Sequence, residues 1–363
     1  MSFKTEIMEF PRFVIMGADA LKKLPYVIQK LHLGSKIQLV SGATFTKKIA
    51  EEVYLLLSDN GFKVSAFTVE SNPVTYMNVK NLAKRLKADG SSVVLGVGGG
   101  RVMDVAKLAS AWLNKPFISV PTSASHDGIA SPIVSFLLRM NVAENMGVEY
   151  TEARAPVAIV ADTSVISNAS RRSLAAGCGD LISKIIAVND WLLAQKVKGE
   201  DYSEYAAAMA LMAANIVKTG ANVIRVGGEK AVRTVVKALI GSGVSMSIAG
   251  SSRPASGAEH LFSHSLDLLS LKHGFEHAEH GMQCGVGAVM MAHLHKINWI
   301  EIRDFLVKIG APVNAKQLGI DPKYIVDALT KAHKIRPERL TILGVKGLTK
   351  AEAEKLASET EVI

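Results

Sequence analysis

The sequence contains few cysteines and few aromatic residues, and both shortages exclude classes of protein. Cys178 and Cys284 are the two cysteines among 363 residues, too few for a disulfide scaffold and without the paired spacing of a structural zinc module. Aromatic residues make up 6% of the chain, and no basic run is interleaved with rings on which single-stranded nucleic acid could stack. We therefore expect two small buried thiols, a cytoplasmic location and no nucleic-acid partner.

Long apolar runs are also missing. None reaches the roughly 20 residues that span a bilayer, and the N-terminal MSFKTEIMEF carries charges where a signal peptide needs an apolar stretch. We expect neither membrane insertion nor secretion. The formal net charge of +9 comes from Lys and Arg scattered along the chain. We interpret it as an aid to solubility, with attraction of an anionic substrate or nucleic acid as the alternative.

The composition and the length indicate a folded protein of two domains. Apolar residues make up 48% and charged residues 21%, which is ordinary globular composition, and 363 residues exceed the size at which one core usually keeps growing. The first half alternates short apolar runs with helical patterns, which predicts a parallel, doubly wound, Rossmann-like sheet. The predicted strands are residues 36–42, 62–67, 91–98, 116–122 and 156–162, with helices near 44–60, 76–89 and 101–113 between them.

Beyond about residue 165 the sequence becomes Ala-rich, Met-containing and helical, for example over 204–224 and 280–297. We predict an α/β domain over residues 1–165 and an all-α domain over 166–363, with the active site in a cleft between them. The sequence contains no internal repeat, low-complexity segment or long linker.

A glycine cluster follows the predicted strand 91–98. Gly98, Gly99 and Gly100 lie between that strand and a helix, where missing Cβ atoms let backbone N–H groups approach a pyrophosphate. The pattern is not a full G-x-G-x-x-G, and tight turns use glycine for conformational reasons alone. Asp104, in the first turn of the helix, is explained by the helix dipole. A second loop, residues 121–132, offers Thr122, Ser123, Ser125 and Ser131 at the end of the next strand.

Five of the ten histidines fall within 21 residues, which indicates a site. His260 and His264 are four residues apart, so both rings share one helix face. One could bind a metal while the other moves protons. His280 precedes small residues that let a helix pack closely, and His277 competes with it for a ligand position. His273 and His277 are typical of exposed histidines, and a satisfied core histidine is the alternative for His264.

Asp180, in GCGDLISK, is the candidate carboxylate. It starts a predicted apolar helix, where a solvated N-cap and a metal ligand are both open readings. Two imidazoles and one carboxylate would leave one coordination position open, as a catalytic zinc requires.

Five ordered motifs carry a resemblance over nearly the whole chain: GVGGGRVMDVAK, PTSASHDGIASP, GCGDLISK, SGAEHLFSH and HGMQCGVG. In this order they resemble the sn-glycerol-1-phosphate dehydrogenases of archaeal membrane-lipid synthesis. That family is related to glycerol dehydrogenase, iron-dependent alcohol dehydrogenases and 3-dehydroquinate synthase.

The resemblance implies one Zn²⁺ per chain, held by Asp180, His260 and His280. It also implies that Asp127, Asp180 and His264 contact the substrate and act in catalysis. The implied contacts of NADH or NADPH are Gly98, Gly99, Gly100, Arg101, Val102, Met103, Asp104, Thr122, Ser123, Ala124, Ser125 and Ser131.

Departures from the relatives refine what the resemblance implies. Lys184 stands where iron-dependent alcohol dehydrogenases place a fourth ligand histidine, which favours zinc over iron. Asp180 stands where the dehydroquinate synthases use Glu, which favours a dehydrogenase.

No acidic residue directly follows the strand 36–41, where Ser41, Thr44, Lys47 and Lys48 lie, so we expect use of both NAD and NADP.

The expected reaction is therefore reduction of dihydroxyacetone phosphate to sn-glycerol 1-phosphate by a homo-oligomer. His264 is expected to relay a proton with its ordinary pKa near 6.5. Glycerol dehydrogenase, acting on the unphosphorylated substrate, is the nearest rival. A basic nucleic-acid-binding protein with a structural metal is the rival from another class.

Overall fold

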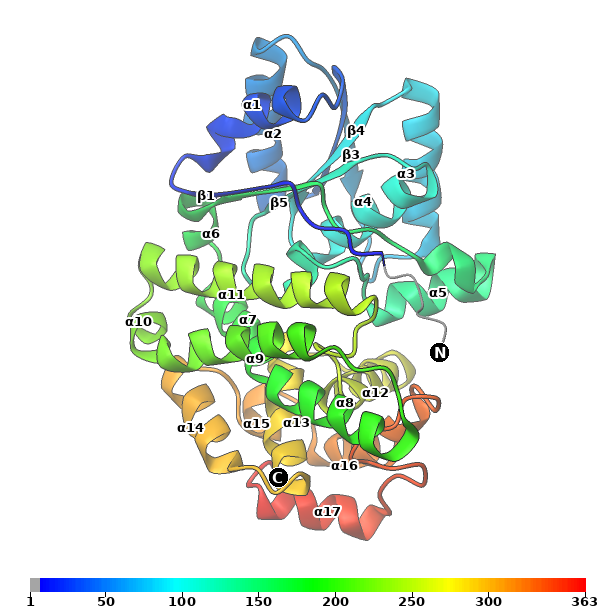
Figure 1. Cartoon of the computed structure of the whole chain (residues 1–363), viewed down its shortest axis with the longest axis vertical. Helices are drawn as coiled ribbons and strands as arrows, with labels where there is room; N and C mark the ends of the chain where they lie inside the picture. The colour runs from blue at the N-terminus through cyan, green and yellow to red at the C-terminus, as the bar shows by residue number, and fades with distance from the viewer. Residues whose placement is uncertain (1–6) are drawn as a thin grey trace. The chain divides into compact units, whose positions relative to one another are not determined.

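The computed structural model describes residues 7–363 and divides the chain into two compact units (Figure 1). We call them the sheet unit, Met8–Ala124 with Gly128–Ser170, and the helical unit, which contains Ser125–Asp127 and Arg171–Ile363. The sheet unit matches the predicted α/β class and the helical unit the predicted all-α class. The exact boundary at 165/166 and the predicted cleft stay predictions.

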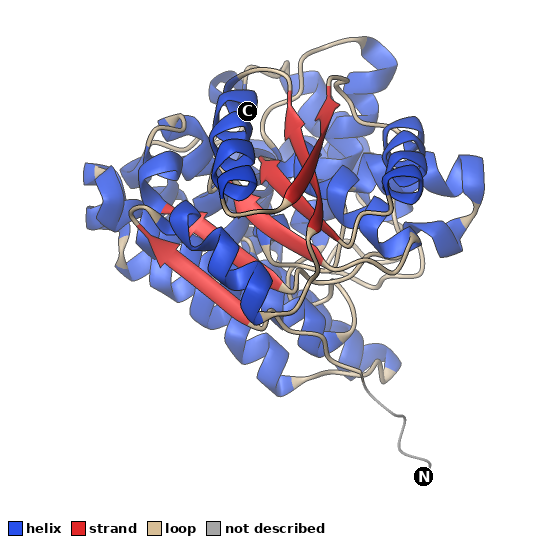
Figure 2. Cartoon of the chain, turned by 90° about the horizontal axis from the view of Figure 1, so that it is seen from above, coloured by secondary structure: helices blue, strands red, loops and turns tan. Residues whose placement is uncertain are grey.

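The sheet unit is built on six parallel strands in the order β1-β6-β5-β4-β2-β3. Helices cover both faces of the sheet, as Figure 2 shows. The strands are β1 (Phe13–Gly17), β2 (Lys36–Gly42), β3 (Lys63–Val69), β4 (Val93–Gly98), β5 (Phe117–Pro121) and β6 (Ala158–Asp162), and the helices are α1 (Leu24–Lys30), α2 (Phe45–Asp59), α3 (Tyr76–Asp89), α4 (Gly100–Trp112), α5 (Phe136–Met146) and α6 (Thr163–Ser167), with short 3₁₀ turns at Ala20–Lys23, Asp127–Ile129 and Val148–Thr151.

Strand β4 explains why the sheet is buried on both faces. Its residues alternate between two apolar clusters: Val93 and Leu95 pack in one, whereas Val94 packs in the other. A strand covered on both faces is a continuous apolar run, as the sequence SSVVLGVG indicated. Strand β1 was not predicted from the sequence, because this five-residue edge strand is only half-buried and pairs with β6 alone.

The two loops predicted to bind a cofactor lie next to each other in the sheet unit. Gly98 ends β4 and pairs in register with Pro121, which ends β5. The N–H group of Thr122 also donates to the Gly98 carbonyl, with an N···O distance of 3.1 Å. Both loops therefore leave the same, carboxyl edge of the parallel sheet.

In the helical unit every regular element within residues 171–363 is a helix. The predicted helical stretch 204–224 is divided at Gly220, so it forms α9 and most of α10. The helices are α7 (Arg171–Ile182), α8 (Lys184–Lys198), α9 (Glu204–Thr219), α10 (Ala221–Val226), α11 (Gly228–Ala249), α12 (Ala258–His273), α13 (His280–Leu294), α14 (Trp299–Ile309), α15 (Ala315–Leu318), α16 (Pro322–Lys331) and α17 (Lys350–Glu359), with a 3₁₀ turn at Ala332–Lys334.

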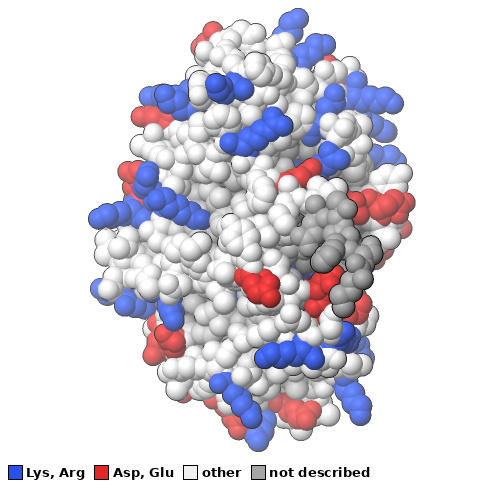
Figure 3. All heavy atoms as spheres, in the orientation of Figure 1, with Lys and Arg blue, Asp and Glu red and all other residues white. Residues whose placement is uncertain are grey.

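Helix α11 alone among the described helices is long and apolar enough to cross a bilayer, judged by length and composition. Its most apolar window is 67% buried within the protein, and core helices pass the same test. Figure 3 shows Lys and Arg side chains interspersed with Asp and Glu over the visible face. This distribution fits the reading of the +9 charge as a scattered, solubilising one.

Candidate metal centre and dinucleotide loops

Two helices of the helical unit approach each other at their backbones, and this contact positions two candidate ligands. A Cβ atom on Gly179 of α7 would lie 2.2 Å from the Gly281 carbonyl oxygen, and one on Gly281 of α13 would lie 1.9 Å from that of Ala176. Only glycine permits this spacing. The contact brings Asp180, the next residue of α7, beside the first turn of α13, where His280 lies. The prediction that Asp180 starts a helix was wrong: it lies near the C-terminal end of α7, which excludes the N-cap reading.

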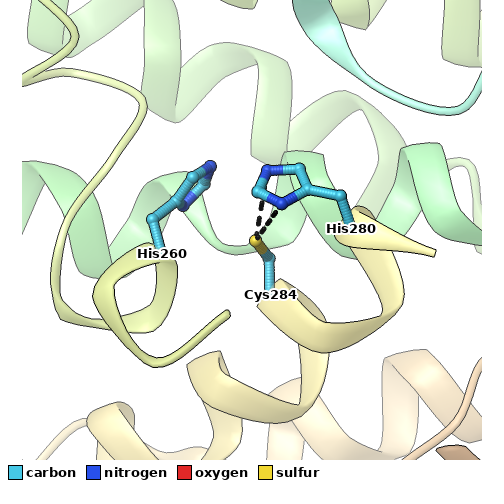
Figure 4. A group of neighbouring side chains, drawn as sticks. All are labelled: His260, His280 and Cys284. Carbon is cyan, nitrogen blue, oxygen red and sulfur yellow. Dashed lines mark hydrogen bonds between the residues drawn. The ribbon is translucent and has the colours of Figure 1, made fainter. Parts of the chain in front are cut away.

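His260 and His280 face each other from α12 and α13, with ring centroids 4.9 Å apart (Figure 4). Asp180 Oδ1 lies 3.6 Å from Nε2 of His260. Two ligand atoms bound tetrahedrally to zinc at 2.0–2.1 Å are roughly 3.3 Å apart. The separation of His260 Nε2 and Asp180 Oδ1 is therefore close to that of two ligands of one metal ion.

Neighbouring side chains fix which nitrogen each of these rings presents. Nδ1 of His260 lies 2.7 Å from the carboxylate of Glu259, so the ring directs Nε2 toward Asp180. The Ser263 hydroxyl donates to Oε1 of Gln283 at 2.8 Å and lies 3.1 Å from Nδ1 of His280. Since its one proton goes to Gln283, the hydroxyl accepts the N–H of His280, which leaves Nε2 as the free lone pair.

Glu259, Ser263 and Gln283 were not predicted as site residues from the sequence. A helical signal exists, because Ser263 follows His260 by three residues and Gln283 follows His280 by three, so each pair shares a helix face. Ser and Gln at helical spacing are too common in buried helices to indicate such a role on their own.

Cys284 also lies at this site, although its sequence context indicated only a small buried residue. Its sulfur lies 3.5 Å from Nε2 of His280 (Figure 4). Among the described residues, His260, His280 and Cys284 form a close group of possible ligands, and His264, Asp267 and His280 form another, whereas Asp180 belongs to neither. Burial, followed by the charges of Asp180 and Glu259, raises the pKa of Cys284 well above its ordinary value. Cys284 and Asp180 are therefore rival third ligands beside His260 and His280.

Lys184 joins the two candidate carboxylates. Its fully buried Nζ lies 2.6 Å from Asp180 Oδ1, 3.0 Å from Asp127 Oδ2 and 3.1 Å from the Ala255 carbonyl oxygen, to which it donates. Asp180 Oδ2 also accepts from the N–H group of Asp127, at 2.9 Å. A carboxylate has lone pairs for both Lys184 and a metal ion.

Asp127 stays ionised within this network. Burial alone would raise its pKa, but the charge of Lys184 and hydrogen bonds from Lys184 and Ser242 outweigh that effect and lower the pKa below its ordinary value. The Ser242 hydroxyl donates to Asp127 Oδ2 at 2.8 Å. Asp127 and Asp180, two of the predicted substrate contacts, are thus brought together.

His264 lies one helical turn after His260 and stacks on His280, with ring centroids 5.6 Å apart. Burial is the main cause that lowers the pKa of His264 to about 4, against a weaker opposing effect of Asp267. This corrects the expectation of an ordinary pKa near 6.5: the ring is neutral at physiological pH. His273 and His277 are exposed, as expected of solvated histidines.

In the sheet unit, Gly99 is the N-cap of α4 and Gly100 its first residue. A Cβ on Gly98 would lie 2.7 Å from side-chain atoms of Val102, so glycine is needed there for packing. Asp104 is buried and accepts from the N–H group of Ser135 at 3.0 Å. The prediction that Asp104 lies in the first turn of the helix was wrong, because α4 begins at Gly100 and has no acidic residue in that turn. The carboxylate instead stabilises the loop that contains Ser135.

The other predicted cofactor contacts lie in the first turn of α4 and in the loop after β5. Arg101 is exposed, Ser123 and Ser125 are half-buried, and Ser131 bonds locally to Ile133. Lys107, which our sequence analysis missed, is fully buried and donates to the carbonyl groups of Gly128 and Ile133, at 2.9 and 2.8 Å. The side chains of Val102, Met103, Thr122 and Ala124 are buried, which leaves backbone groups as their possible contacts.

The chain is similar to known proteins over nearly its full length. Residues 15–170 match the family model described as iron-containing alcohol dehydrogenase. Glycerol-1-phosphate dehydrogenase [NAD(P)+] of Pyrococcus horikoshii is 50% identical over 98% of this chain and 99% of its own, and that of Pyrococcus abyssi is 50% identical over the same shares. The crystal structure of glycerol dehydrogenase from Schizosaccharomyces pombe covers 99% of this chain and 91% of its own with a TM-score of 0.77 at 20% identity, which confirms the fold. The chain belongs to the glycerol-1-phosphate dehydrogenase [NAD(P)+] family of oxidoreductases.

Proposed function

We propose that this protein reduces dihydroxyacetone phosphate with NADH or NADPH to sn-glycerol 1-phosphate, reversibly, and so supplies the glycerophosphate backbone of archaeal-type membrane lipids. The names of the relatives support the substrate and the cofactor. The observation that carries the proposal is the convergence of His260 Nε2, oriented by Glu259, on the Asp180 carboxylate at 3.6 Å. Such oriented ligands are typical of catalytic metal centres.

We propose Asp180, His260 and His280 as the ligands of one zinc ion. When bound, the ion would polarise the substrate ketone as a Lewis acid while the nicotinamide supplies the hydride. Zinc is favoured over iron because Lys184 occupies the position at which the iron enzymes are expected to place a fourth ligand histidine. Its ammonium group cannot bind a metal ion while it donates to both carboxylates.

The remaining residues would orient the substrate and handle its proton. Asp127 is ionised, so its carboxylate can accept a hydrogen bond from a substrate hydroxyl group. His264 is neutral at physiological pH, so it would act as a hydrogen-bond donor or as one member of a proton relay rather than as a cationic acid. Full kcat in His264→Ala across the whole pH range would exclude that role.

The dinucleotide would bind to the loops of the sheet unit at the ends of β4 and β5. The segment from Gly98 to Asp104 supplies backbone N–H groups at the start of α4. Thr122, Ser123, Ala124, Ser125 and Ser131 would complete the contacts. No carboxylate side chain occurs in the segment Ser41–Lys48 after β2, which supports use of both NADH and NADPH.

One assay tests the activity. The zinc-loaded enzyme is given NADH with dihydroxyacetone phosphate or with dihydroxyacetone, and the stereochemistry of the product is then determined. We expect a strong preference for the phosphorylated ketone and the sn-1 product. Equal or better turnover of dihydroxyacetone would instead make the protein a glycerol dehydrogenase. A cytoplasmic homo-oligomer remains part of the proposal, to be tested by fractionation and light scattering.

A further inference from the structure

Three arginines gather at one loop of the helical unit, outside the proposed metal centre. The loop, residues 250–257, joins α11 to α12. Arg336 Nη1 and Arg339 Nη2 both donate to the hydroxyl of Ser252, at 3.2 and 3.0 Å, and Arg339 Nη1 donates to the Ser256 carbonyl oxygen at 2.7 Å. We call Arg253, Arg336 and Arg339 the arginine cluster. Two guanidinium groups that share one neutral oxygen repel each other, and an anion would relieve the repulsion.

The carboxylate of Glu200 pairs with Arg253. Arg253 Nε donates to Glu200 Oε1 at 2.6 Å, and its Nη1 donates to the Leu340 carbonyl oxygen at 2.9 Å, so this pair anchors the segment that carries the other two arginines. Arg339 forms no ion pair with any residue in the described range 7–363. Burial first, and then the charges of Arg336 and Arg253, lower its pKa to about 9, which still leaves it charged at neutral pH.

The same loop is attached to the proposed metal centre. The Ala255 carbonyl oxygen accepts from Lys184, which also binds Asp180. Gly257 is the N-cap of α12, the helix that carries His260 and His264. The loop therefore connects the arginine cluster, through Ser252 and Ser256, to Lys184 and to the start of α12.

We propose that Arg336 and Arg339 form the subsite for the phosphate group of a phosphorylated three-carbon ketone. The inference rests on the proposed function and adds the residues that would distinguish a phosphorylated from an unphosphorylated substrate. A phosphate matches a pair of guanidinium groups in charge and in geometry, because each planar fork can donate two parallel hydrogen bonds. Ser252 and the Arg253–Glu200 pair are positioning groups that hold the two forks.

The test compares dihydroxyacetone phosphate with dihydroxyacetone for the zinc-loaded wild type and for R336M, R339M and R336K. Methionine keeps much of the side-chain volume and removes the charge. We expect the ratio of the two kcat/KM values to fall about 30- to 100-fold in both methionine variants, from the loss of charged hydrogen bonds. The inhibition constant of inorganic phosphate should rise about tenfold or more in both methionine variants. For R336K, the kcat/KM ratio and the inhibition constant should lie between those of the wild type and R336M. The matched control is R233M, an exposed position on α11 that pairs with Glu229 and should keep the wild-type ratio.

The outcomes separate the two proposals. A wild type that does not prefer dihydroxyacetone phosphate overturns the proposed function. A wild type with that preference, combined with methionine variants that stay folded, retain zinc and keep the ratio within threefold, overturns the phosphate subsite alone. If both variants fail to fold, labelling of arginine side chains in the wild-type enzyme with phenylglyoxal tests the phosphate subsite instead. Phosphate should protect Arg336 and Arg339 from modification, and unchanged labelling of both would overturn the subsite.

Discussion

At the residue scale, the proposed metal centre depends on hydrogen bonds that select one nitrogen of each histidine. Ser263→Ala removes the acceptor of the His280 Nδ1–H group. We expect zinc affinity to fall about 10- to 100-fold, because groups that orient a ligand typically contribute this much. Competition with a chromogenic chelator measures the affinity. Ser270→Ala is the control on the same helix, since that hydroxyl donates to the Phe275 carbonyl group instead.

The two cysteines allow the proposed ligand set to be tested against its rival. If Asp180 is the third ligand, Cys284→Ala should keep zinc affinity within about threefold, whereas Asp180→Ala should abolish binding. Cys178→Ala is a matched control, because that thiol is equally buried. Loss of zinc from Cys284→Ala, with Asp180→Ala still loaded, would show that the sulfur is the ligand.

Loss of the Lys184 side chain should lower the stability of the protein strongly. Lys184→Met would leave the carboxylates of Asp127 and Asp180 buried without their counter-ion, and removal of one partner of a buried ion pair typically costs about 3–5 kcal/mol. Urea unfolding of the zinc-free protein measures the free energy of unfolding. The exposed pair Lys218–Glu301 provides the comparison. Lys218→Met should change the free energy of unfolding by less than about 1 kcal/mol.

At the scale of elements, the contact between α7 and α13 should control the metal centre. Gly281→Ala would push a Cβ into the Ala176 carbonyl group and separate the helices. We expect a loss of about 1–3 kcal/mol in the free energy of unfolding and weaker zinc binding. Gly241→Ala, in α11 with no atom within 4 Å of the added Cβ, should be neutral or stabilise by about 0.5–1 kcal/mol. Equal effects of the two substitutions would contradict the role assigned to the contact.

The elements also show what the sequence can and cannot predict. The buried strands β2, β4, β5 and β6 were predictable, because apolar runs between helical patterns have few other packings. The edge strand β1 was not, since a short half-buried strand has no distinctive pattern. The histidine cluster indicated a site, but the approach of α7 to α13 that brings Asp180 beside His260 depends on long-range packing. The arginine cluster joins residues more than 80 positions apart, and no local pattern signals it.

At the scale of the whole molecule, zinc should stabilise the folded chain by mass action. With free zinc at 100 times its dissociation constant, the gain is about 2.7 kcal/mol. The gain in stability is measured from the melting temperature before chelation, after chelation and again after zinc is restored. Activity should disappear and return together with the stability. The melting temperature of Asp180→Ala should not respond to zinc, and activity that persists in the zinc-free enzyme would argue against the Lewis-acid role.

The buried ammonium group of Lys184 bears on how the enzyme matures. A site made of carboxylates alone would repel itself until an ion arrived, so folding would have to wait for metal, as in zinc fingers. Here a covalently attached cation already offsets part of the negative charge of Asp127 and Asp180. The newly made chain can therefore reach its final shape first and load its ion afterwards, into a site that is already assembled.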